Sequence, residues 1–327
     1  MKQLDINQLI ETVNTYIKNL SYSREPERLY APIEYVLDLG GKRLRPVLML
    51  LAYNLYKEDV EAILSQAAGI ETYHNFTLLH DDLMDNAEVR RGKPVVHRKW
   101  NANAAILSGD AMLILSYQFM LNACPADKIK EVMEVFGTTA LEICEGQQYD
   151  TDFEQRNDVT EEEYLEMIRL KTSVLLAASL KIGAILGGAS SEDAEKLYDF
   201  GVKMGLAFQL QDDYLDVYGD PTVFGKKIGG DILCNKKTYM LINAYALSTG
   251  DTKRELKEWI ETEEFVPEEK IKAVTAIYNK VGIANLCMER INKYYDEGLA
   301  ILDSVSVPSE LKDNMRTFVA KLVDRKL

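Results

Sequence analysis

Two short acidic motifs have the clearest potential for chemistry in this sequence. Residues 81–85 read Asp-Asp-Leu-Met-Asp and residues 212–216 read Asp-Asp-Tyr-Leu-Asp, so the pattern DDxxD occurs twice. In a helix, residues four apart share a face, which gathers the carboxylates of each motif. Carboxylates about 4 Å apart repel each other by about 4 kcal/mol at an effective dielectric near 20. One such motif is equally typical of a solvated helix face, but two of them in apolar surroundings favour bound cations.

The donor atoms indicate which cation would bind. Carboxylates without thiolates or paired histidines favour a hard ion such as Mg²⁺ and disfavour zinc. Mg²⁺ usually completes its coordination with water and substrate phosphate. The two motifs therefore predict a phosphorylated ligand. The candidate metal ligands are Asp81, Asp82, Asp85, Asp212, Asp213 and Asp216.

Four basic segments could bind such a phosphorylated ligand. They are Gly-Gly-Lys-Arg-Leu-Arg-Pro at 40–46, Arg-Arg at 90–91, Lys-Thr at 171–172 and Phe-Gly-Lys-Lys-Ile-Gly-Gly-Asp at 224–231. Each segment alone is typical of a turn or a solvated charge pair. Together they favour two anion sites, one reached through metal and one through Lys and Arg side chains directly.

The chain must position these groups on helices. None of its eight prolines lies between Pro125 and Pro221, and apolar residues in that stretch recur every three or four positions. Residues 160–163 have the spacing of a capping box, and residues 187–193 indicate one helix end followed by a new start. Strand patterns and Gly/Ser/Pro-rich linkers are lacking. We therefore predict one all-α domain, residues 1–327, with breaks that include a segment from Pro26 to Pro32.

Composition narrows the possible partners. The chain has 327 residues, with 38 Lys and Arg against 52 Asp and Glu, and its net charge of −14 argues against nucleic acid as a partner. The first 20 residues read as an amphipathic helix and lack a secretory signal. The apolar stretch 104–123 is interrupted by Gly109-Asp110, so no membrane span is expected. Four widely spaced cysteines without a CxxC pair favour a reducing cytoplasm.

As a set, the motifs resemble the trans-type isoprenyl diphosphate synthases, or polyprenyl synthetases, of the short-chain geranylgeranyl and farnesyl type. The first DDxxD is followed by Arg-Arg and Gly, and the second lies in QLQDD, with GGKRLRP upstream and Lys-Thr between them. The resemblance runs from about Gly40 to Lys237. It implies the isoprenoid synthase fold, a single all-α bundle of roughly a dozen helices around a deep central cavity. It also implies a homodimer.

The reaction that the resemblance implies is Mg²⁺-dependent head-to-tail prenyl transfer. An allylic diphosphate ionises, the double bond of isopentenyl diphosphate attacks the carbocation, and a proton is lost to the released diphosphate. Asp81, Asp85 and Asp212 would be direct ligands of three Mg²⁺ ions, while the remaining three aspartates would be partial or indirect ligands. The ions would offset the charge that builds on the leaving diphosphate.

The resemblance also assigns the cations. The allylic diphosphate would be held by Arg90, Lys171, Lys227 and Lys236, and isopentenyl diphosphate by Lys42, Arg45, His74 and Arg91. Thr172 and Gln209 would lie near the carbocation. The residues expected to act in catalysis are Asp81, Asp85, Lys171, Thr172, Gln209, Asp212 and Lys227. His74 alone would be equally typical of a core histidine. Cys234 stands where relatives often have an acid or glycine, and this departure makes the role of Lys236 less certain than the reaction.

Product length is expected to depend on the residues that precede the first motif. In the family, a bulky residue four or five positions before the first aspartate blocks the chain tunnel. Phe76 is five before Asp81, about 7.5 Å along a helix, and Thr77 is four before it. A single aromatic at the deeper position favours a C20 product, geranylgeranyl diphosphate, with C15 farnesyl diphosphate next.

Two other function classes compete with this interpretation. A class I terpene cyclase ionises the same substrates, but GGKRLRP and the second complete DDxxD argue against it. A noncatalytic subunit of a heteromeric prenyl synthase tends to lose an Asp-rich motif, and both are intact here. Assay with Mg²⁺, isopentenyl diphosphate and allylic diphosphates would separate the three classes.

Overall fold

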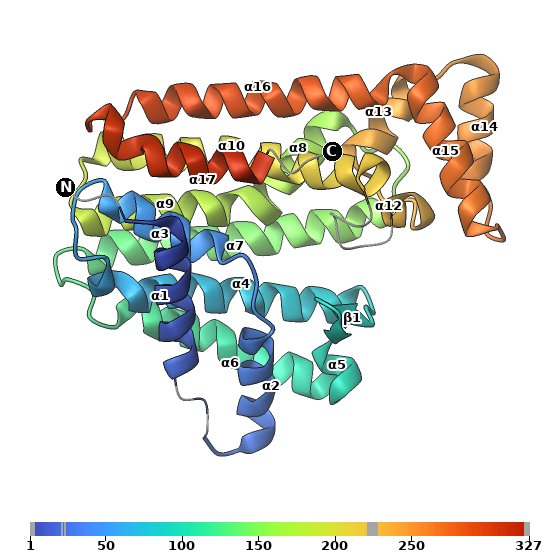
Figure 1. Ribbon diagram of the computed structural model, residues 1–327. Helices are drawn as coiled ribbons and strands as arrows, with labels where there is room; N and C mark the ends of the chain where they lie inside the picture. The colour runs from blue at the N-terminus through green and yellow to red at the C-terminus, as the bar shows by residue number, and fades with distance from the viewer. Residues whose placement is uncertain (1–3, 21, 23, 221–227, 324–327) are drawn as a thin grey trace. The chain divides into compact units, whose positions relative to one another are not determined.

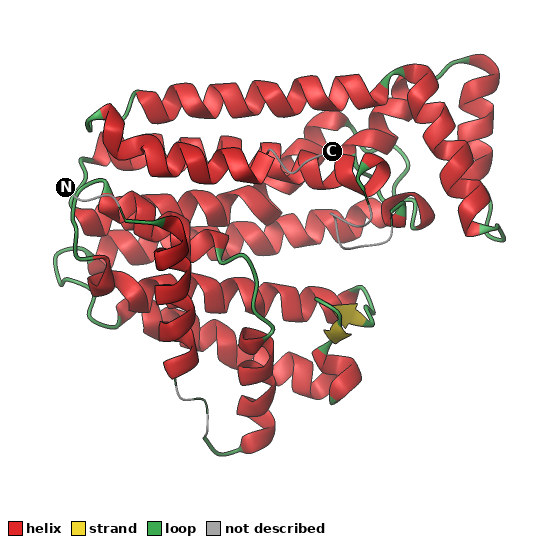
Figure 2. Ribbon diagram, in the orientation of Figure 1, coloured by secondary structure: helices red, strands yellow, loops and turns green. Residues whose placement is uncertain are grey.

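The computed structural model describes residues 4–20, 22, 24–220 and 228–323, and most of these are in helices joined by loops (Figure 2). The strands among the described residues are short and antiparallel, β1 (Val89–Arg90) and β2 (Lys93–Pro94). The predicted all-α fold class is confirmed.

Helices in the first half of the chain are short at first and become long around the first acidic motif. They are α1 (Ile6–Asn19), α2 (Glu27–Asp38), α3 (Leu44–Asn54), the 3₁₀ helix η1 (Val60–Ile63), α4 (Leu64–Met84), α5 (Val96–Lys99), α6 (Ala102–Leu121) and α7 (Ile129–Glu154).

The second half contains the π-helical turn η2, which interrupts what would otherwise be one long helix. The elements are α8 (Glu161–Ile168), η2 (Arg169–Ser173), α9 (Val174–Gly187), α10 (Ser191–Tyr218), α12 (Gly230–Leu233), α13 (Tyr239–Leu247), α14 (Gly250–Glu261), α15 (Pro267–Val281), α16 (Ile283–Asp303), η3 (Ser309–Lys312) and α17 (Asp313–Val323).

Local sequence signals account for most helix ends. Asp5 caps α1 by accepting hydrogen bonds from two backbone N–H groups, and Thr160 forms the predicted capping box with Glu163. Helix α9 ends at Gly187 and α10 begins at Ser191, as expected. The predicted break from Pro26 to Pro32 is wrong in its second part, because α2 begins after Pro26 and contains Pro32. Pro32 is the sixth residue of this helix, so it lacks the N–H that would bond to the Arg28 carbonyl, and the helix continues to Asp38 in spite of that loss.

The chain divides into two compact units, each described by itself. Unit 1 comprises residues 1–138, 178–198 and 305–315, and unit 2 comprises residues 139–177, 199–304 and 316–327. The prediction of a single domain stays a prediction.

Unit 1 is organised around α4, which packs along α6 and also contacts α1 and α3 (Figure 1). Two glycines permit the close approach of α4 and α6. A Cβ at Gly69 would lie 3.0 Å from the Ser116 carbonyl oxygen, and a Cβ at Gly109 would overlap the His80 ring. The C-terminal turn of α4, which carries the first acidic motif, is thereby fixed against α6.

Unit 2 has its own apolar core beneath α16. Helix α13 packs against α8, α15 and α16, and α14 lies beside α15 (Figure 1). The largest fully buried side chains there include Tyr164, Tyr239 and Tyr278. Leu210 of α10 belongs to the same core. The last turns of α10, which carry the second acidic motif, are thus anchored by this core.

Two described helical stretches are long and apolar enough to cross a membrane by length and composition. In Glu161–Gly187, 83% of the most apolar window is buried within the protein, as in a core helix of a soluble protein. In α6 only 33% of that window is buried, and Ile114 and Leu107 are about 60% exposed (60% and 59%). The outer face of α6 is therefore an apolar surface.

Candidate active site

The first acidic motif forms the end of α4 in unit 1. Asp81 and Asp82 lie in the last turn, and Asp85 is the C-cap, whose N–H donates to the Asp81 carbonyl at 2.9 Å. The helical geometry therefore continues through the motif and keeps Asp81 and Asp85 one turn apart. Asp82 is buried and accepts a hydrogen bond from Arg90 Nε at 2.8 Å, and another Arg90 nitrogen lies 3.8 Å from Asp81. Asp82 is thus engaged by the protein, and its role as an indirect metal ligand stays a prediction.

A tight hairpin presents the two arginines that follow this motif. Arg91 and Gly92 connect β1 to β2 and both have positive φ (53° and 75°), the geometry of a type I′ turn. Burial lowers the pKa of Arg90, but its hydrogen bond to Asp82 and the charges of the motif raise it above its usual value. Arg90 is therefore fully charged beside the first acidic motif.

Arg91 reaches the Gly-Gly segment that precedes α3. Its Nη1 donates a hydrogen bond to the Gly40 carbonyl, and a Cβ at Gly41 would lie 2.8 Å from Nη2. Only glycine fits there, because Gly41 also has φ of 141°. The structure thus brings together the 40–46 and 90–91 segments, which the sequence could only suggest separately.

Arg45 and His74 complete this cationic group. Arg45 Nη1 donates to His74 Nε2 at 3.1 Å. Burial lowers the pKa of Arg45 to about 10, although Glu71 raises it. Burial and then the charges of Arg45, Arg91, Arg90 and Arg43 hold the pKa of His74 well below its usual range, so its ring is neutral. Lys42, the fourth residue predicted for the isopentenyl site, is exposed on the loop before α3.

Arg43 and Glu71 were not identified from the sequence. Arg43, with φ of 50°, is buried and pairs with Glu71 at 2.7 Å, while also donating to Asn14 and to the Leu37 carbonyl. All three contacts are with groups of unit 1, so this arginine fixes the loop that carries Lys42 and Arg45. A buried arginine 28 residues from its partner gives no sequence signal beyond its charge.

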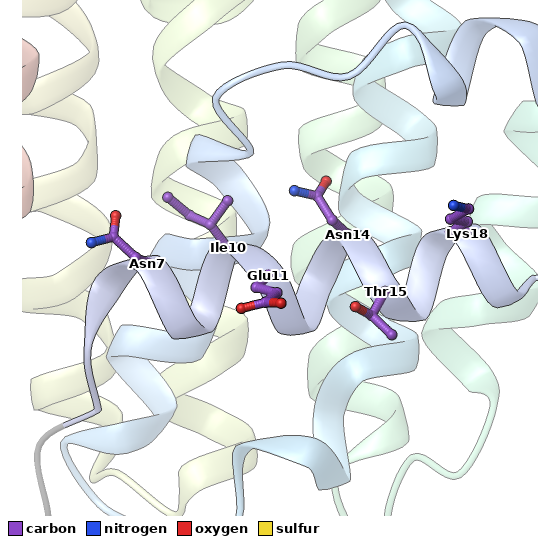
Figure 3. A pocket seen from close by; sticks show the side chains of 6 residues that line it. All are labelled: Asn7, Ile10, Glu11, Asn14, Thr15 and Lys18. Carbon is purple, nitrogen blue, oxygen red and sulfur yellow. The ribbon is translucent and has the colours of Figure 1, made fainter.

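The cations of unit 1 border a small cavity. Its lining residues are Tyr35, Val36, Leu39, Asn75, Leu78, Leu79, Asp82, Arg90, Arg91, Val95 and Val96. A larger and more open hollow lies on α1 and is lined by six side chains that all come from that helix (Figure 3). None of these six is a predicted site residue. The smaller cavity therefore includes three of the residues predicted for the site, Asp82, Arg90 and Arg91, and the larger hollow includes none.

The second acidic motif lies near the end of α10 in unit 2. Asp213 is buried and accepts hydrogen bonds from the Tyr164 hydroxyl and from Gln209 Nε2. Burial, with the nearby charge of Asp231, raises the pKa of Asp213 to about 7, although both hydrogen bonds lower it. Asp216 accepts from the backbone N–H of Asp231 at 3.0 Å. Asp213 and Asp216 are thus engaged by the protein, and their predicted indirect role in metal binding stays a prediction.

Thr172 and Gln209, which the sequence placed near the reacting carbon, are joined directly. The Thr172 hydroxyl donates to Gln209 Oε1 at 3.2 Å, and Gln209 Nε2 donates to Asp213 Oδ1 at 3.2 Å. The chain of hydrogen bonds ends at Tyr164, a residue that was not predicted from the sequence. This chain of hydrogen bonds orients both the Gln209 amide and the Asp213 carboxylate.

Two of the predicted lysines of unit 2 share a carboxylate that was also not predicted. Lys171 Nζ lies 2.6 Å from Asp150 Oδ2, and Lys236 Nζ lies 3.9 Å from the same oxygen. Cys234, two residues before Lys236, is exposed. The fourth allylic candidate, Lys227, lies outside the described residues.

The chain-length candidates lie on α4. Phe76 is buried and packs edge to face against Tyr73 and His80, with ring centroids 5.4 and 4.9 Å away. The Thr77 hydroxyl donates to the His74 carbonyl at 2.8 Å. Phe76 is thus a fixed ring one turn before the acidic motif.

The metal ligands suit magnesium by their chemistry, since every candidate donor is a carboxylate oxygen. Within the described part of the chain, no group of three or more His, Cys, Asp or Glu side chains is arranged to hold a metal ion. Any ion bound by either motif would therefore take further oxygen ligands from water or a phosphorylated ligand. The first motif lies in unit 1 and the second in unit 2.

Comparison with known proteins decides the family. Residues 26–278 match the sequence model described as polyprenyl synthetase. The chain belongs to the polyprenyl synthetase family. The predicted resemblance, the all-α isoprenoid synthase fold and the prenyltransferase class are confirmed.

Several relatives are similar in sequence to this polyprenyl synthetase over most of their length. Geranylgeranyl diphosphate synthase of Methanosarcina mazei is 44% identical over 234 residues, which cover 71% of this chain and 72% of that protein. Geranylfarnesyl diphosphate synthase of Natronomonas pharaonis is 43% identical over 251 residues, or 72% of this chain and 74% of that protein. A crystal structure of a geranylgeranyl pyrophosphate synthase is 43% identical, with a TM-score of 0.95 and coverage of 99% and 100%.

Proposed function

We propose that this polyprenyl synthetase condenses isopentenyl diphosphate with an allylic diphosphate and makes geranylgeranyl diphosphate, a C20 product. The observation that carries the proposal is a group of basic side chains in unit 1. Arg91 lines the small cavity together with Asp82 of the first acidic motif and donates to the Gly40 carbonyl, and Arg45 donates to His74. A terpene cyclase needs only one diphosphate site, whereas this group is additional to the acidic motifs. The similarity to named geranylgeranyl diphosphate synthases supports the same substrates.

Each acidic motif serves the allylic substrate in this proposal. Asp81, Asp85 and Asp212 would hold Mg²⁺, and the ions would supply charge neutralisation for a diphosphate leaving group. Arg90 is held at the first motif by Asp82, and Lys171 and Lys236 are charged donors in unit 2. These side chains, with Lys227, bind the allylic diphosphate and hold it in place as the carbon–oxygen bond breaks.

The second substrate needs a different site. Isopentenyl diphosphate keeps its diphosphate, so donors without a Lewis acid suffice, and Lys42, Arg45, His74 and Arg91 provide them. A neutral His74 that accepts from Arg45 presents its other ring nitrogen as a donor. The bound phosphates are thereby held by ion pairs and hydrogen bonds alone.

Thr172 and Gln209 are proposed to lie near the carbocation. Both are dipolar groups already engaged in hydrogen bonds, so neither is a strong nucleophile that would be alkylated. The released diphosphate accepts the final proton, and no protein base is required. Phe76 sets the product length from below the reacting centre.

We also propose a homodimer and a cytoplasmic location. The outer face of α6 exposes Ile106, Leu107, Ile114 and Leu121, which a second copy would cover. All four cysteines lie in the described residues and none is in a disulfide, which suits a reducing compartment.

One assay tests the reaction. Purified protein is incubated with Mg²⁺, isopentenyl diphosphate and either dimethylallyl, geranyl or farnesyl diphosphate, and the products are identified by mass spectrometry. Incorporation of isopentenyl units with accumulation at C20 is expected, and chelation of the metal should abolish it. Loss of the allylic substrate without isopentenyl incorporation would support the cyclase. If neither substrate reacts, the noncatalytic subunit is favoured.

A single substitution tests the metal assignment. Asp81→Ala removes a proposed direct ligand from the end of α4, so turnover should fall by a factor on the order of 10³ or more. The circular dichroism at 222 nm should stay unchanged, because Asp81 lies in the last turn of the helix. Near-normal turnover would contradict a role for Asp81 in metal binding.

A further inference from the structure

Unit 2 contains a carboxylate that the mechanism above leaves without a role. Asp150 lies on α7, with 19% of its side chain exposed. Its Oδ2 is 2.6 Å from Lys171 Nζ and 3.9 Å from Lys236 Nζ. The Lys171 side chain is 23% exposed, so this contact is shielded from solvent more than an ordinary surface ion pair. Both lysines are among those that we assign to the allylic diphosphate.

The backbone holds Asp150 and Lys171 in this relation. Gly146 lies one helical turn before Asp150, and a Cβ at that position would be 2.4 Å from the Lys171 backbone nitrogen. Helix α7 and the π-helical turn η2 are therefore in backbone contact. A residue four positions further along α7 lies on the same face. The Asp150 carboxylate is thus directed to Lys171 by two rigid elements.

The charges at this place favour an ionised carboxylate. Burial raises the pKa of Asp150, but the ammonium groups of Lys236 and Lys171 more than offset it, and the resulting pKa is below its ordinary value. The Asp150 carboxylate is therefore paired with the two ammonium groups that the proposed function assigns to the allylic diphosphate.

We propose that Asp150 is a positioning residue for the allylic diphosphate, acting by fixing the Lys171 ammonium and, more weakly, that of Lys236. The inference rests on the proposed function, since it requires that these lysines bind the diphosphate. A long lysine side chain has many rotamers, and a short charge-assisted hydrogen bond selects one of them before substrate arrives. Without Asp150 the positive charge would remain, but its direction would be lost.

The test compares Asp150→Asn with Asp152→Asn on the same helix. The Asp152 side chain is exposed and accepts a hydrogen bond from Gln148 Nε2, so its variant is a matched control. In Asp150→Asn, kcat/KM for the allylic diphosphate should fall about 10- to 100-fold, the range for a misplaced binding group. The KM for isopentenyl diphosphate should stay within about twofold of wild type in both variants.

A double-mutant cycle shows whether Asp150 acts through Lys171. If it does, Asp150→Asn should change kcat/KM less than about threefold when Lys171→Gln is already present. Asp150→Glu keeps the charge, should recover part of the loss, and replaces Asp150→Asn in the cycle if the latter does not fold. Equal activity of the Asp150 and Asp152 variants would overturn the proposal, as would an undiminished effect in the Lys171→Gln background. Failure of the proposed function is distinct, because wild type and Asp152→Asn would then both be inactive.

Discussion

Phe76 is a single ring held by its neighbours, and this makes it a direct test of product length. Tyr73 and His80 pack against its two sides, and Tyr73 in turn packs on Phe136. Phe76→Ala would remove the ring while its neighbours stay in place. We expect products longer than C20, measured by chromatography of the dephosphorylated prenols. Thr77→Ala removes little volume and should shift the distribution less, and an unchanged distribution in Phe76→Ala would exclude it as the tunnel floor.

His74 should make stability depend on pH. Its pKa in the folded protein lies well below the ordinary value near 6.5, because burial and neighbouring arginines disfavour the protonated ring. As pH falls below about 6.5, the unfolded chain takes up a proton that the folded chain does not, so stability is lost towards acid. His74→Gln removes this dependence.

The measurement is urea unfolding at pH 7.5 and pH 5.5. Wild type should lose about 1 kcal/mol more than His74→Gln between these two values, since one pH unit corresponds to about 1.4 kcal/mol. Substitution of His97 would be less informative, because both of its ring nitrogens are buried without a hydrogen-bond partner among the described residues. An identical loss in wild type and His74→Gln would show that His74 protonates normally in the folded protein.

At the scale of elements, the contact between α7 and η2 depends on one glycine. A Cβ at Gly146 would lie 2.4 Å from the Lys171 nitrogen and 2.8 Å from the Leu170 carbonyl carbon, and neither backbone atom can move easily. Gly146→Ala should destabilise the protein by about 1–3 kcal/mol by overpacking and should lower turnover by displacing Lys171.

Gly137 on the same helix is the matched control. Its nearest neighbour to a new Cβ is the Tyr117 hydroxyl at 3.9 Å, so alanine fits without displacement. Gly137→Ala should stabilise the protein by about 0.5–1 kcal/mol because alanine is the better helix former. Urea unfolding measures both variants. Equal changes in the two would mean that α7 does not require glycine against η2.

The elements also show what the sequence could predict. Helical periodicity, the Thr160 capping box and the Gly187 helix end are local signals, and all three were confirmed. The π-helical turn at 169–173 had no local signal, because the same residues would fit an α-helix, and the packing of Gly146 on it is long-range. Pro32 was misjudged because α2 continues through an interior proline, which no local signal in the sequence indicated.

The candidate site also has residues that the sequence could predict and residues that it could not. The acidic motifs and the cations adjacent to them were predictable, because their residue types carry the chemistry. Their partners were not, since Asp150, Tyr164 and Glu71 become recognisable only through contacts with residues 21 to 49 positions away. A carboxylate or phenol in an acidic, tyrosine-rich chain does not by itself indicate a role.

For the whole molecule, net charge and local charge act in opposite directions. The chain carries −14 overall, which repels a diphosphate at long range. Each unit nevertheless has a cation beside its own acidic motif, because Arg90 pairs with Asp82 in unit 1 and the charge of Lys236 acts on Asp213 in unit 2. Binding of the polyanionic substrates should therefore rely on these short-range contacts and on accompanying Mg²⁺, with little help from steering by the protein as a whole.

The outer face of α6 is the feature that should decide the oligomeric state. Leu107 and Ile114 are two turns apart on this helix and 59% and 60% exposed, so they form one apolar stripe with Leu121. Placing a charge there would oppose burial against a second copy. The variant Leu107→Lys/Ile114→Lys should therefore run as a monomer of 37.1 kDa in light scattering, where wild type should show twice that mass.

Leu247→Lys provides the control for that experiment. Leu247 is 51% exposed at the end of α13, away from the α6 stripe in the sequence and in a different unit, so its variant should keep the mass of wild type. The comparison separates a specific interface from a general response to added lysines, since the two sites have similar exposure. A monomeric wild type, or a dimer that survives both lysines on α6, would rule out this face as the contact, and the exposed leucines would then be ordinary surface residues.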